Sequence, residues 1–333
     1  MKEIIGVKIV VIGGGTGSFT LLRSLKNYTS HITALVNMAD DGGSTGVLRD
    51  ELGVLPPGDV RQCLVALAES ERTRDLFNYR FGEGTFSGHA FGNIFMAALE
   101  KMTGNFAEAV EEASRVLNIV GRVEPVTLDP VTLVLEKQNG EVIKGEFKIG
   151  HIDFAGVMRP NIHLEPEPRL NPAAAEAIAK ADLVVIAPGN LYGSLAPALV
   201  VPGISEALRS SKAKKVYVCN LVTKPGQTDG FAVHEFASEI ERLGNFKLDY
   251  VLYNTEKPTP DLIAKYAKDG ELPVEYDKET LKRQHYRAKG GNYLSNEFVA
   301  HNSSAGDPIA TTRTLIRHDS DSIARSLMKL YFS

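Results

Sequence analysis

The chain has 333 residues and a formal net charge of -4, with 43% hydrophobic and 23% charged residues. This length allows one large domain or two ordinary ones, and the composition is typical of globular proteins. No stretch resembles a membrane span or a signal peptide, and the charge provides no general basic field. We therefore expect a cytoplasmic protein that neither inserts into a membrane nor binds nucleic acid. Cys63 and Cys219 lie far apart, and we expect two buried thiols rather than a disulfide.

Strand and helix patterns alternate along the first third of the chain. The β-branched run at 8–12 predicts a strand that ends in a glycine-rich turn, and the apolar spacing that follows predicts a helix. Residues 31–38 predict a second strand, which stops at the polar, glycine-rich segment 40–46. We expect that segment to be a loop. Further helices are predicted over 59–70, 73–79, 90–102 and 106–117.

Residues 120–168 follow a different pattern. Apolar and polar residues alternate there around Asn139-Gly140, the favoured two-residue hairpin turn, which predicts a small antiparallel β insertion. We expect it to lie within one domain spanning 1–333. The α/β alternation then resumes with a helix capped by Asn171. Later elements are expected as strands over 181–189, 214–223, 248–254 and 314–317, a helix from about 202, a helix over 231–243, and a final helix capped by Asp319 or Ser320.

Alternation of this kind predicts an α/β fold with a mostly parallel sheet covered on both faces. Four polar segments follow predicted strands, and the ligands of such sheets bind beyond the carboxyl ends of the strands. We therefore expect these four segments to meet at one edge of the sheet. They are residues 13–17, 40–46, 187–194 and 223–230.

The first of these segments predicts a phosphate-binding turn. Its backbone amides and the start of the next helix can face an anion, and no side chain blocks close approach. Ser18 stands where a dinucleotide-binding fingerprint has its third glycine, and the alternative is a plain tight turn. The candidate ligand-binding residues are Gly13, Gly14, Gly15, Thr16 and Gly17.

The second segment has the composition of a magnesium site. Asp40 or Asp41 could hold Mg²⁺ through one carboxylate and water molecules, while the backbone contacts phosphate. A ribose contact and a solvated turn are the alternatives. The neighbouring candidates are Gly42, Gly43 and Ser44.

Other polar residues are weaker candidates. His89 and Asn93 are four apart and would share a helix face, as a donor pair, or with His89 as a general base. Asp59 and Arg61 begin a predicted helix, and we favour a structural role for Asp59.

The later loops provide further candidates for a base, a sugar or a phosphate. They are Gly189, Asn190, Tyr192, Lys224 and Arg317, the last ending a predicted strand. Ordinary loop chemistry and a structural Arg-Asp pair are the alternatives.

Seven motifs in order, from GGGTG through ADDGGSTGVLR, SGHAFGN and APGNLYGSLAPALVVPGI to RHDS, resemble the bacterial gluconeogenesis factor family. That family is a branch of the 2-phospho-L-lactate transferase-like superfamily. The resemblance implies a Rossmann-like three-layer α/β/α fold, a cytoplasmic protein needed for growth on gluconeogenic carbon sources and for cell shape, and binding of UDP-sugars. It places Thr16, Asp40, Asn190 and Arg317 at the ligand.

Three functions remain under consideration. The first is a regulatory protein that binds a UDP-sugar, forms a homo-oligomer and requires no cofactor, although Mg²⁺ could take part. The second is a magnesium-dependent transferase of the 2-phospho-L-lactate type. The third is a nicotinamide-dependent oxidoreductase, although the chain lacks the third glycine of the dinucleotide-binding fingerprint. The sequence favours a non-enzymatic role and leaves phosphorylation of Ser320 open.

Overall fold

The computed structural model describes residues 6–137, 139–153, 159–295 and 316–332. Its main feature is a seven-stranded sheet with the order β10-β9-β8-β7-β1-β2-β3. Every neighbouring pair in it is parallel. This is the doubly wound order of Rossmann-type folds, so the predicted fold class is confirmed. The strands are β1 Ile9–Ile12, β2 Ile32–Val36, β3 Arg122–Pro125, β7 Leu183–Ile186, β8 Lys214–Val218, β9 Tyr250–Asn254 and β10 Arg287–Gly291.

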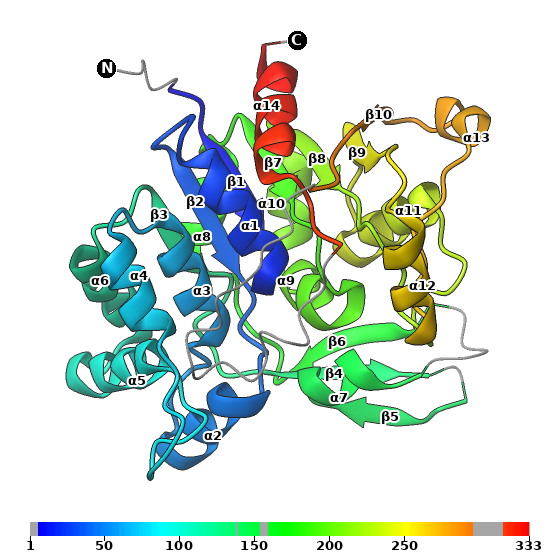
Figure 1. Cartoon of the computed structure of the whole chain (residues 1–333). Coiled ribbons are helices and arrows are strands. Elements are labelled where there is room, and N and C mark those ends of the chain that lie inside the picture. Colours follow the sequence, from blue (N-terminus) through cyan, green and yellow to red (C-terminus); the bar gives the residue numbers. More distant parts are fainter. Residues whose placement is uncertain (1–5, 138, 154–158, 296–315, 333) are drawn as a thin grey trace.

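Helices cover both faces of this sheet (Figure 1). On one face α1 packs against α3 and α14, and on the other α8 packs against α10. The fold therefore has three layers. The helices are α1 Gly15–Leu25, α2 Gly43–Leu52, α3 Gly58–Leu67, α4 Glu71–Asn78, α5 Phe91–Thr103, α6 Phe106–Leu117, α8 Pro172–Lys180, the π-turn η1 Leu191–Leu195, α9 Ala196–Leu199, α10 Ile204–Ser210, α11 Val233–Gly244, α12 Pro260–Lys268, α13 Lys278–Lys282 and α14 Ser320–Tyr331.

The central strands are fully buried. Both β1 (IVVI) and β7 (LVVI) are continuous apolar runs, as expected for parallel strands with helices on both faces. The side chains of Asn171 and Asp319 cap α8 and α14, as predicted. Cys63 and Cys219 are buried free thiols, also as predicted.

Within the described ranges, no single helix is long and apolar enough to cross a membrane, and only the bent pair Leu191–Leu199 with Ile204–Ser210 has the required length and composition together.

The insertion begins after β3, because residues 122–125, predicted within it, pair with β2 in the main sheet. It forms a separate three-stranded antiparallel sheet of order β5-β4-β6. It contains β4 Thr132–Glu136, β5 Val142–Lys144, β6 Asn161–Glu165 and the helix α7 Glu146–His151. Glu136 pairs with Val142, so the turn is longer than the predicted two residues. Lys137 also bonds Glu141, and Gly140 takes a positive φ of 85° in the turn. Residues 146–148, predicted to continue the strand pattern, belong instead to α7.

Other elements differ from the sequence predictions. Gly43 starts α2, so half of the segment predicted as a loop is the first turn of a helix. Residues 314 and 315 of the last predicted strand lie outside the described ranges, and residues 316 and 317 are not in a strand. The next residue, His318, forms an isolated antiparallel bridge to Leu294. The sequence patterns do not predict α12, α13 or β10. Both α13 (KETLK) and β10 (RAKGG) are short and mostly polar.

Candidate functional site

The four polar segments all leave the carboxyl ends of parallel strands, as predicted. They follow β1, β2, β7 and β8. Strand order reverses between β1 and β7, which is where ligands bind in sheets of this topology. A side chain on Gly17 would collide with the carbonyl oxygen of Pro188, so the glycine turn and the loop after β7 lie in direct contact. The sheet therefore brings these two loops together.

The glycine turn encloses a carboxylate of the protein itself. The backbone N–H of Gly15 donates to Asp59 Oδ1 at 2.9 Å, and a Cβ on Gly14 would overlap the same carboxyl group. One backbone amide of the predicted phosphate-binding turn therefore already has an acceptor. Thr16 and Gly17 follow in the first turn of α1, where backbone amides have no acceptor within the helix.

Asp40 lies beside Asp59. Its Oδ1 accepts the N–H of Gly42 at 3.0 Å, and its Oδ2 would lie 2.6 Å from a Cβ on Gly58, the first residue of α3. Burial raises the pKa of Asp40. Burial, and then the neighbouring Asp40 carboxylate, raises the pKa of Asp59 to about 7. Two partly accessible carboxylates therefore lie close together. The contact of Asp59 with the Gly15 amide is the structural role that the sequence favoured.

Asp41 has a different position. Its Oδ1 accepts the backbone N–H of Phe147 at 2.7 Å, and a Cβ on Gly145 would lie 2.6 Å from its Oδ2. Asp41 therefore fastens the insertion to the loop after β2, while Asp40 faces Asp59. Of the two aspartates proposed for Mg²⁺, Asp40 has the better geometry.

Glu146 is a component of the site that the sequence did not indicate. It begins α7, and its Oε1 would lie 2.6 Å from a Cβ on Gly193. Burial and then the charges of Asp40, Asp59 and Asp41 raise the pKa of Glu146 to about 8. The residue is 106 positions from Asp40, so only the packing of the insertion on the site reveals it.

In the loop after β7, Asn190 and Tyr192 have structural contacts. Asn190 Oδ1 accepts the backbone N–H groups of Tyr192 and Gly193 at 3.2 and 3.1 Å and so caps the π-turn η1. Tyr192 is 1% exposed and donates its hydroxyl hydrogen to the buried Glu239 at 3.1 Å. The prediction that Tyr192 offers a hydrogen-bonding group to a ligand is therefore wrong, because its side chain points into the core. Gly189 is fixed by Asn220, whose Nδ2 donates to its carbonyl at 2.8 Å.

His89 and Asn93 meet at Ser44. Ser44 Oγ lies 3.0 Å from His89 Nδ1 and 3.3 Å from Asn93 Nδ2. The predicted proximity is present, but His89 precedes α5 rather than lying on it. Arg61 donates to Asn93 Oδ1 at 2.8 Å and is 7% exposed, so Asn93 is held in a buried network. Ser44 and His89 are both partly accessible to solvent.

Lys224 and Arg317 lie on the β8 side of the carboxyl edge of the sheet. Burial lowers the pKa of Lys224, and the carboxylates of Glu271 and Glu146 partly counter this effect. The carbonyl of Arg317 accepts the N–H of Ser295 at 2.8 Å. Next to it, His318 Nε2 donates to the carbonyl of Cys219 at 3.0 Å, and burial lowers the pKa of His318 to about 4. Arg317 thus lies at the carboxyl edge of the sheet, beyond β8 and β10.

A cleft of about 740 Å³ adjoins this position, at the carboxyl ends of β8 and β9. Its walls include Asn220, Asn254, Tyr276 and Ile316. The edge of the sheet therefore has room for a ligand part larger than a phosphate.

The described residues could hold a magnesium ion only together with a bound ligand that supplies further oxygen atoms. In the described part of the chain, no three His, Cys, Asp or Glu side chains form a metal cluster. Mg²⁺ typically takes one or two carboxylates and completes its shell with water and substrate phosphate. The Asp40 and Asp59 pair fits that requirement, because a cation would offset the burial and the neighbouring charge that disfavour the ionised forms of these two carboxyl groups.

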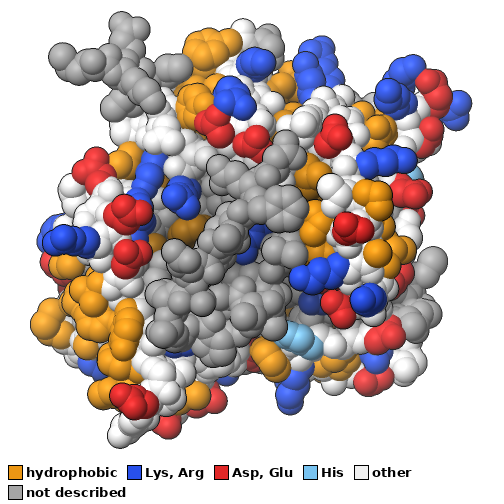
Figure 2. All heavy atoms as spheres, in the orientation of Figure 1, with side chains coloured by type: hydrophobic (Ala, Val, Ile, Leu, Met, Phe, Trp, Pro, Cys, Tyr) orange, Lys and Arg blue, Asp and Glu red, His pale blue; other side chains and the backbone are white. Residues whose placement is uncertain are grey.

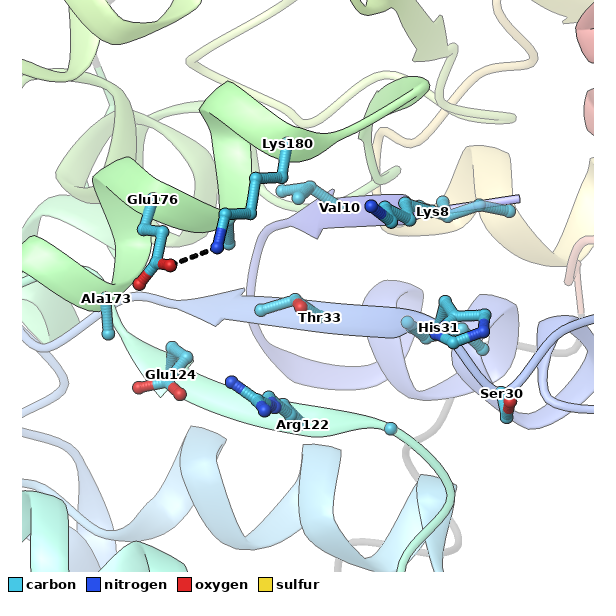
Figure 3. Close-up of a pocket in the computed structure, with 14 residues that line it drawn as sticks. Lys8, Val10, Ser30, His31, Thr33, Arg122, Glu124, Ala173, Glu176 and Lys180 are labelled. Carbon is cyan, nitrogen blue, oxygen red and sulfur yellow. Dashed lines mark hydrogen bonds and ion pairs between the residues drawn. The ribbon is translucent and has the colours of Figure 1, made fainter. Parts of the chain in front are cut away.

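Another cavity lies on a face of the sheet, away from this edge. It measures about 350 Å³ and lies between α8 and the strands β1, β2 and β3 (Figure 3). Lys8, His31 and Arg122 line it at the amino ends of these strands, and Lys180 pairs with Glu176 on α8. Its place at the amino ends is not where such sheets bind nucleotides.

Charges of both signs lie interspersed on the described part of the face that Figure 2 shows. In Figure 2 the Lys and Arg side chains lie among Asp and Glu side chains across the visible described area. An anionic ligand therefore has to be recognised by local groups at the carboxyl edge rather than by a broad positive field.

The sequence pattern of the family described as 2-phospho-L-lactate transferase CofD matches residues 9–294. A Thermotoga maritima protein named "Putative gluconeogenesis factor" is 43% identical over 324 residues, covering 96% of this chain and 97% of its own. The gluconeogenesis factor of Bacillus subtilis is 38% identical over 328 residues, covering 97% of this chain and 98% of its own.

A solved structure agrees with these relationships. The crystal structure of a UPF0052 family member from Bacillus halodurans has a TM-score of 0.86 and 37% sequence identity, covering 97% of this chain and 99% of that one. Sequence and fold therefore agree over nearly the whole length. The chain belongs to the gluconeogenesis factor family, within the wider family of the 2-phospho-L-lactate transferase CofD.

Proposed function

We propose that this protein binds a UDP-sugar, UDP-N-acetylglucosamine or UDP-glucose, and acts as a cytoplasmic regulator needed for growth on gluconeogenic carbon sources and for cell shape. The relatives' name supports the link to gluconeogenesis. The observation that supports a nucleotide diphosphate as the ligand is the position of the Asp40 and Asp59 carboxyl groups beside the first turn of α1.

The electrostatics of this pair favour a diphosphate that arrives with a cation. The amides of Thr16 and Gly17 at the start of α1 attract negative oxygen, whereas the two carboxylates repel it. A bound Mg²⁺ would be held by Asp40 and Asp59 and would supply the charge that lets phosphate approach. Arg317 would then contact the same diphosphate from the β8 side.

Calorimetry tests this proposal directly. UDP-N-acetylglucosamine, UDP-glucose, guanosine diphosphate and NAD are titrated with and without Mg²⁺ into the wild type, Asp40→Asn and the control Asp50→Asn. Asp50 is an exposed carboxylate on α2 that pairs with Arg49, so its loss removes a surface ion pair and no carboxylate of the site. We expect UDP-sugar binding that strengthens with Mg²⁺ and weakens at least about tenfold in Asp40→Asn alone. Absence of UDP-sugar binding by the wild type would refute the proposal.

The alternative function is a magnesium-dependent transferase of the 2-phospho-L-lactate type, which the family match favours. In that reaction an acceptor hydroxyl attacks the phosphoryl group of a nucleotide-activated donor, and the nucleoside monophosphate leaves. Glu146 lies beside the carboxylate pair, and the same charges and burial raise its pKa to about 8, so its ionised form, which predominates above that pH, could take the proton of the hydroxyl. Product formation from such a donor, lost in Asp40→Asn, would establish this activity.

A further inference from the structure

The outer side of α7 carries two aromatic rings. Phe147 and His151 are one turn apart, with ring centroids 4.4 Å apart and planes inclined by 34°. His151 Nδ1 lies 2.6 Å from the carbonyl oxygen of Phe147, so this nitrogen carries the hydrogen that it donates. Both residues are exposed, and Phe147 is 53% accessible. The pair is therefore an ordered aromatic surface open to solvent.

This surface adjoins the carboxylate site. The N–H of Phe147 is tied to Asp41, and a Cβ on Gly42 would lie 3.2 Å from Phe147 Cδ2 and 3.5 Å from Asp40 Oδ1. The ring edge and the Asp40 carboxylate thus flank the same glycine. A ligand whose phosphates reach Asp40 would pass the Phe147 ring where the ligand leaves the site.

The other side of α7 explains why this position is fixed. Glu146 and Gly150 face the loop after β7, where Asn190 Nδ2 reaches towards the Gly150 carbonyl. The helix is thus anchored to the loops after β2 and β7 at once. Tyr192, the aromatic residue of the second loop, is buried against Glu239. A base bound beside α7 would therefore stack on an aromatic ring of the insertion and not on the loop after β7.

We propose that Phe147, supported by His151, is the stacking surface for the base of the nucleotide ligand. The inference rests on the proposed function, because it assigns the base subsite of the same ligand. Centroids 4.4 Å apart at 34° place the His151 ring over one face of the Phe147 ring, which leaves the other face for the base. Stacking on an aromatic ring is open to any base, so the sugar and phosphate contacts have to come from the loops of the site.

The absence of tryptophan from the chain allows a direct test. Phe147→Trp introduces a single indole at the proposed subsite, and Phe332→Trp places one on an exposed residue at the end of α14 as a control. We expect saturating UDP-N-acetylglucosamine and UMP with Mg²⁺ to quench the fluorescence of Phe147→Trp. Pyrophosphate with Mg²⁺ should leave it unchanged, and Phe332→Trp should respond to none of them.

Affinity provides the second measurement. Phe147→Ala should weaken UDP-N-acetylglucosamine binding about tenfold and leave pyrophosphate binding unchanged, whereas Phe147→Tyr should retain affinity. If the wild type binds the UDP-sugar while Phe147→Trp shows no quenching and Phe147→Ala keeps full affinity, the base does not stack on Phe147, but the proposed function stands. If the wild type binds no UDP-sugar, the proposed function and the stacking surface are both refuted.

Discussion

Replacement of Asp59 by Asn should stabilise the protein at alkaline pH. Asp59 accepts the amide of Gly15 and faces Asp40, and its pKa rises from an ordinary 3.8 to about 7 through burial and then through the Asp40 charge. The folded state therefore holds this proton over a range where the unfolded chain has lost it. Stability falls as pH rises from about 4 to 7, and the full penalty is present above pH 7.

The size of the effect follows from the same numbers. A rise from 3.8 to about 7 corresponds to about 4 kcal/mol of unfavourable free energy for the ionised form. Because the side chain is partly accessible, we expect solvent screening to reduce this to about 1–2 kcal/mol. The Asn side chain can still accept the Gly15 amide through its oxygen, so the contact with the glycine turn remains.

Urea unfolding without divalent cations measures the gain at pH 4.5 and at pH 8. We expect Asp59→Asn to exceed the wild type at pH 8 and to gain much less at pH 4.5, which lies far below the folded pKa of about 7 and less than one unit above the ordinary value of 3.8. Asp129→Asn is the contrast, because Arg169 lowers the pKa of Asp129 and its loss should bring no gain. An Asp59→Asn gain that is absent at pH 8, or equal at both pH values, would refute the reasoning.

Three further predictions concern the loops around the site. Tyr192→Phe should lower the free energy of unfolding by about 1–2 kcal/mol and leave UDP-sugar affinity unchanged in calorimetry, because the hydroxyl bonds the buried Glu239. Gly17→Ala should cost about 1–3 kcal/mol in urea unfolding, since its Cβ meets the Pro188 carbonyl; wild-type stability would contradict that contact. Arg317→Ala should weaken UDP-sugar binding about tenfold, and unchanged affinity would exclude a phosphate contact.

The architecture was largely predictable because strong local signals agree with it. Continuous apolar strands, caps such as Asn171 and glycine-rich strand ends are short-range features, and together they predict a parallel sheet with its loops at one edge. Short polar elements such as β10 carry little periodic signal and were missed. The first turn of α2 was also missed, because Gly43 and Ser44 favour loops by composition.

The site was only partly predictable because its contacts are long-range. Asp40 follows a strand and could be found from its position, but its pairing with Asp59 depends on how α3 packs beside α1. Glu146 comes from an insertion whose helix resembled a strand in the sequence. Tyr192 shows the reverse case. Its loop sequence predicted a hydroxyl group open to a ligand, but the side chain points into the core.

A crystal structure of the protein with UDP-N-acetylglucosamine and Mn²⁺, used as an anomalous substitute for Mg²⁺, tests the central claim most directly. The account predicts a metal peak between the carboxylates of Asp40 and Asp59, with the diphosphate over the amides of Thr16 and Gly17. A nucleotide bound at full occupancy elsewhere on the molecule, with no metal at this pair, would contradict it.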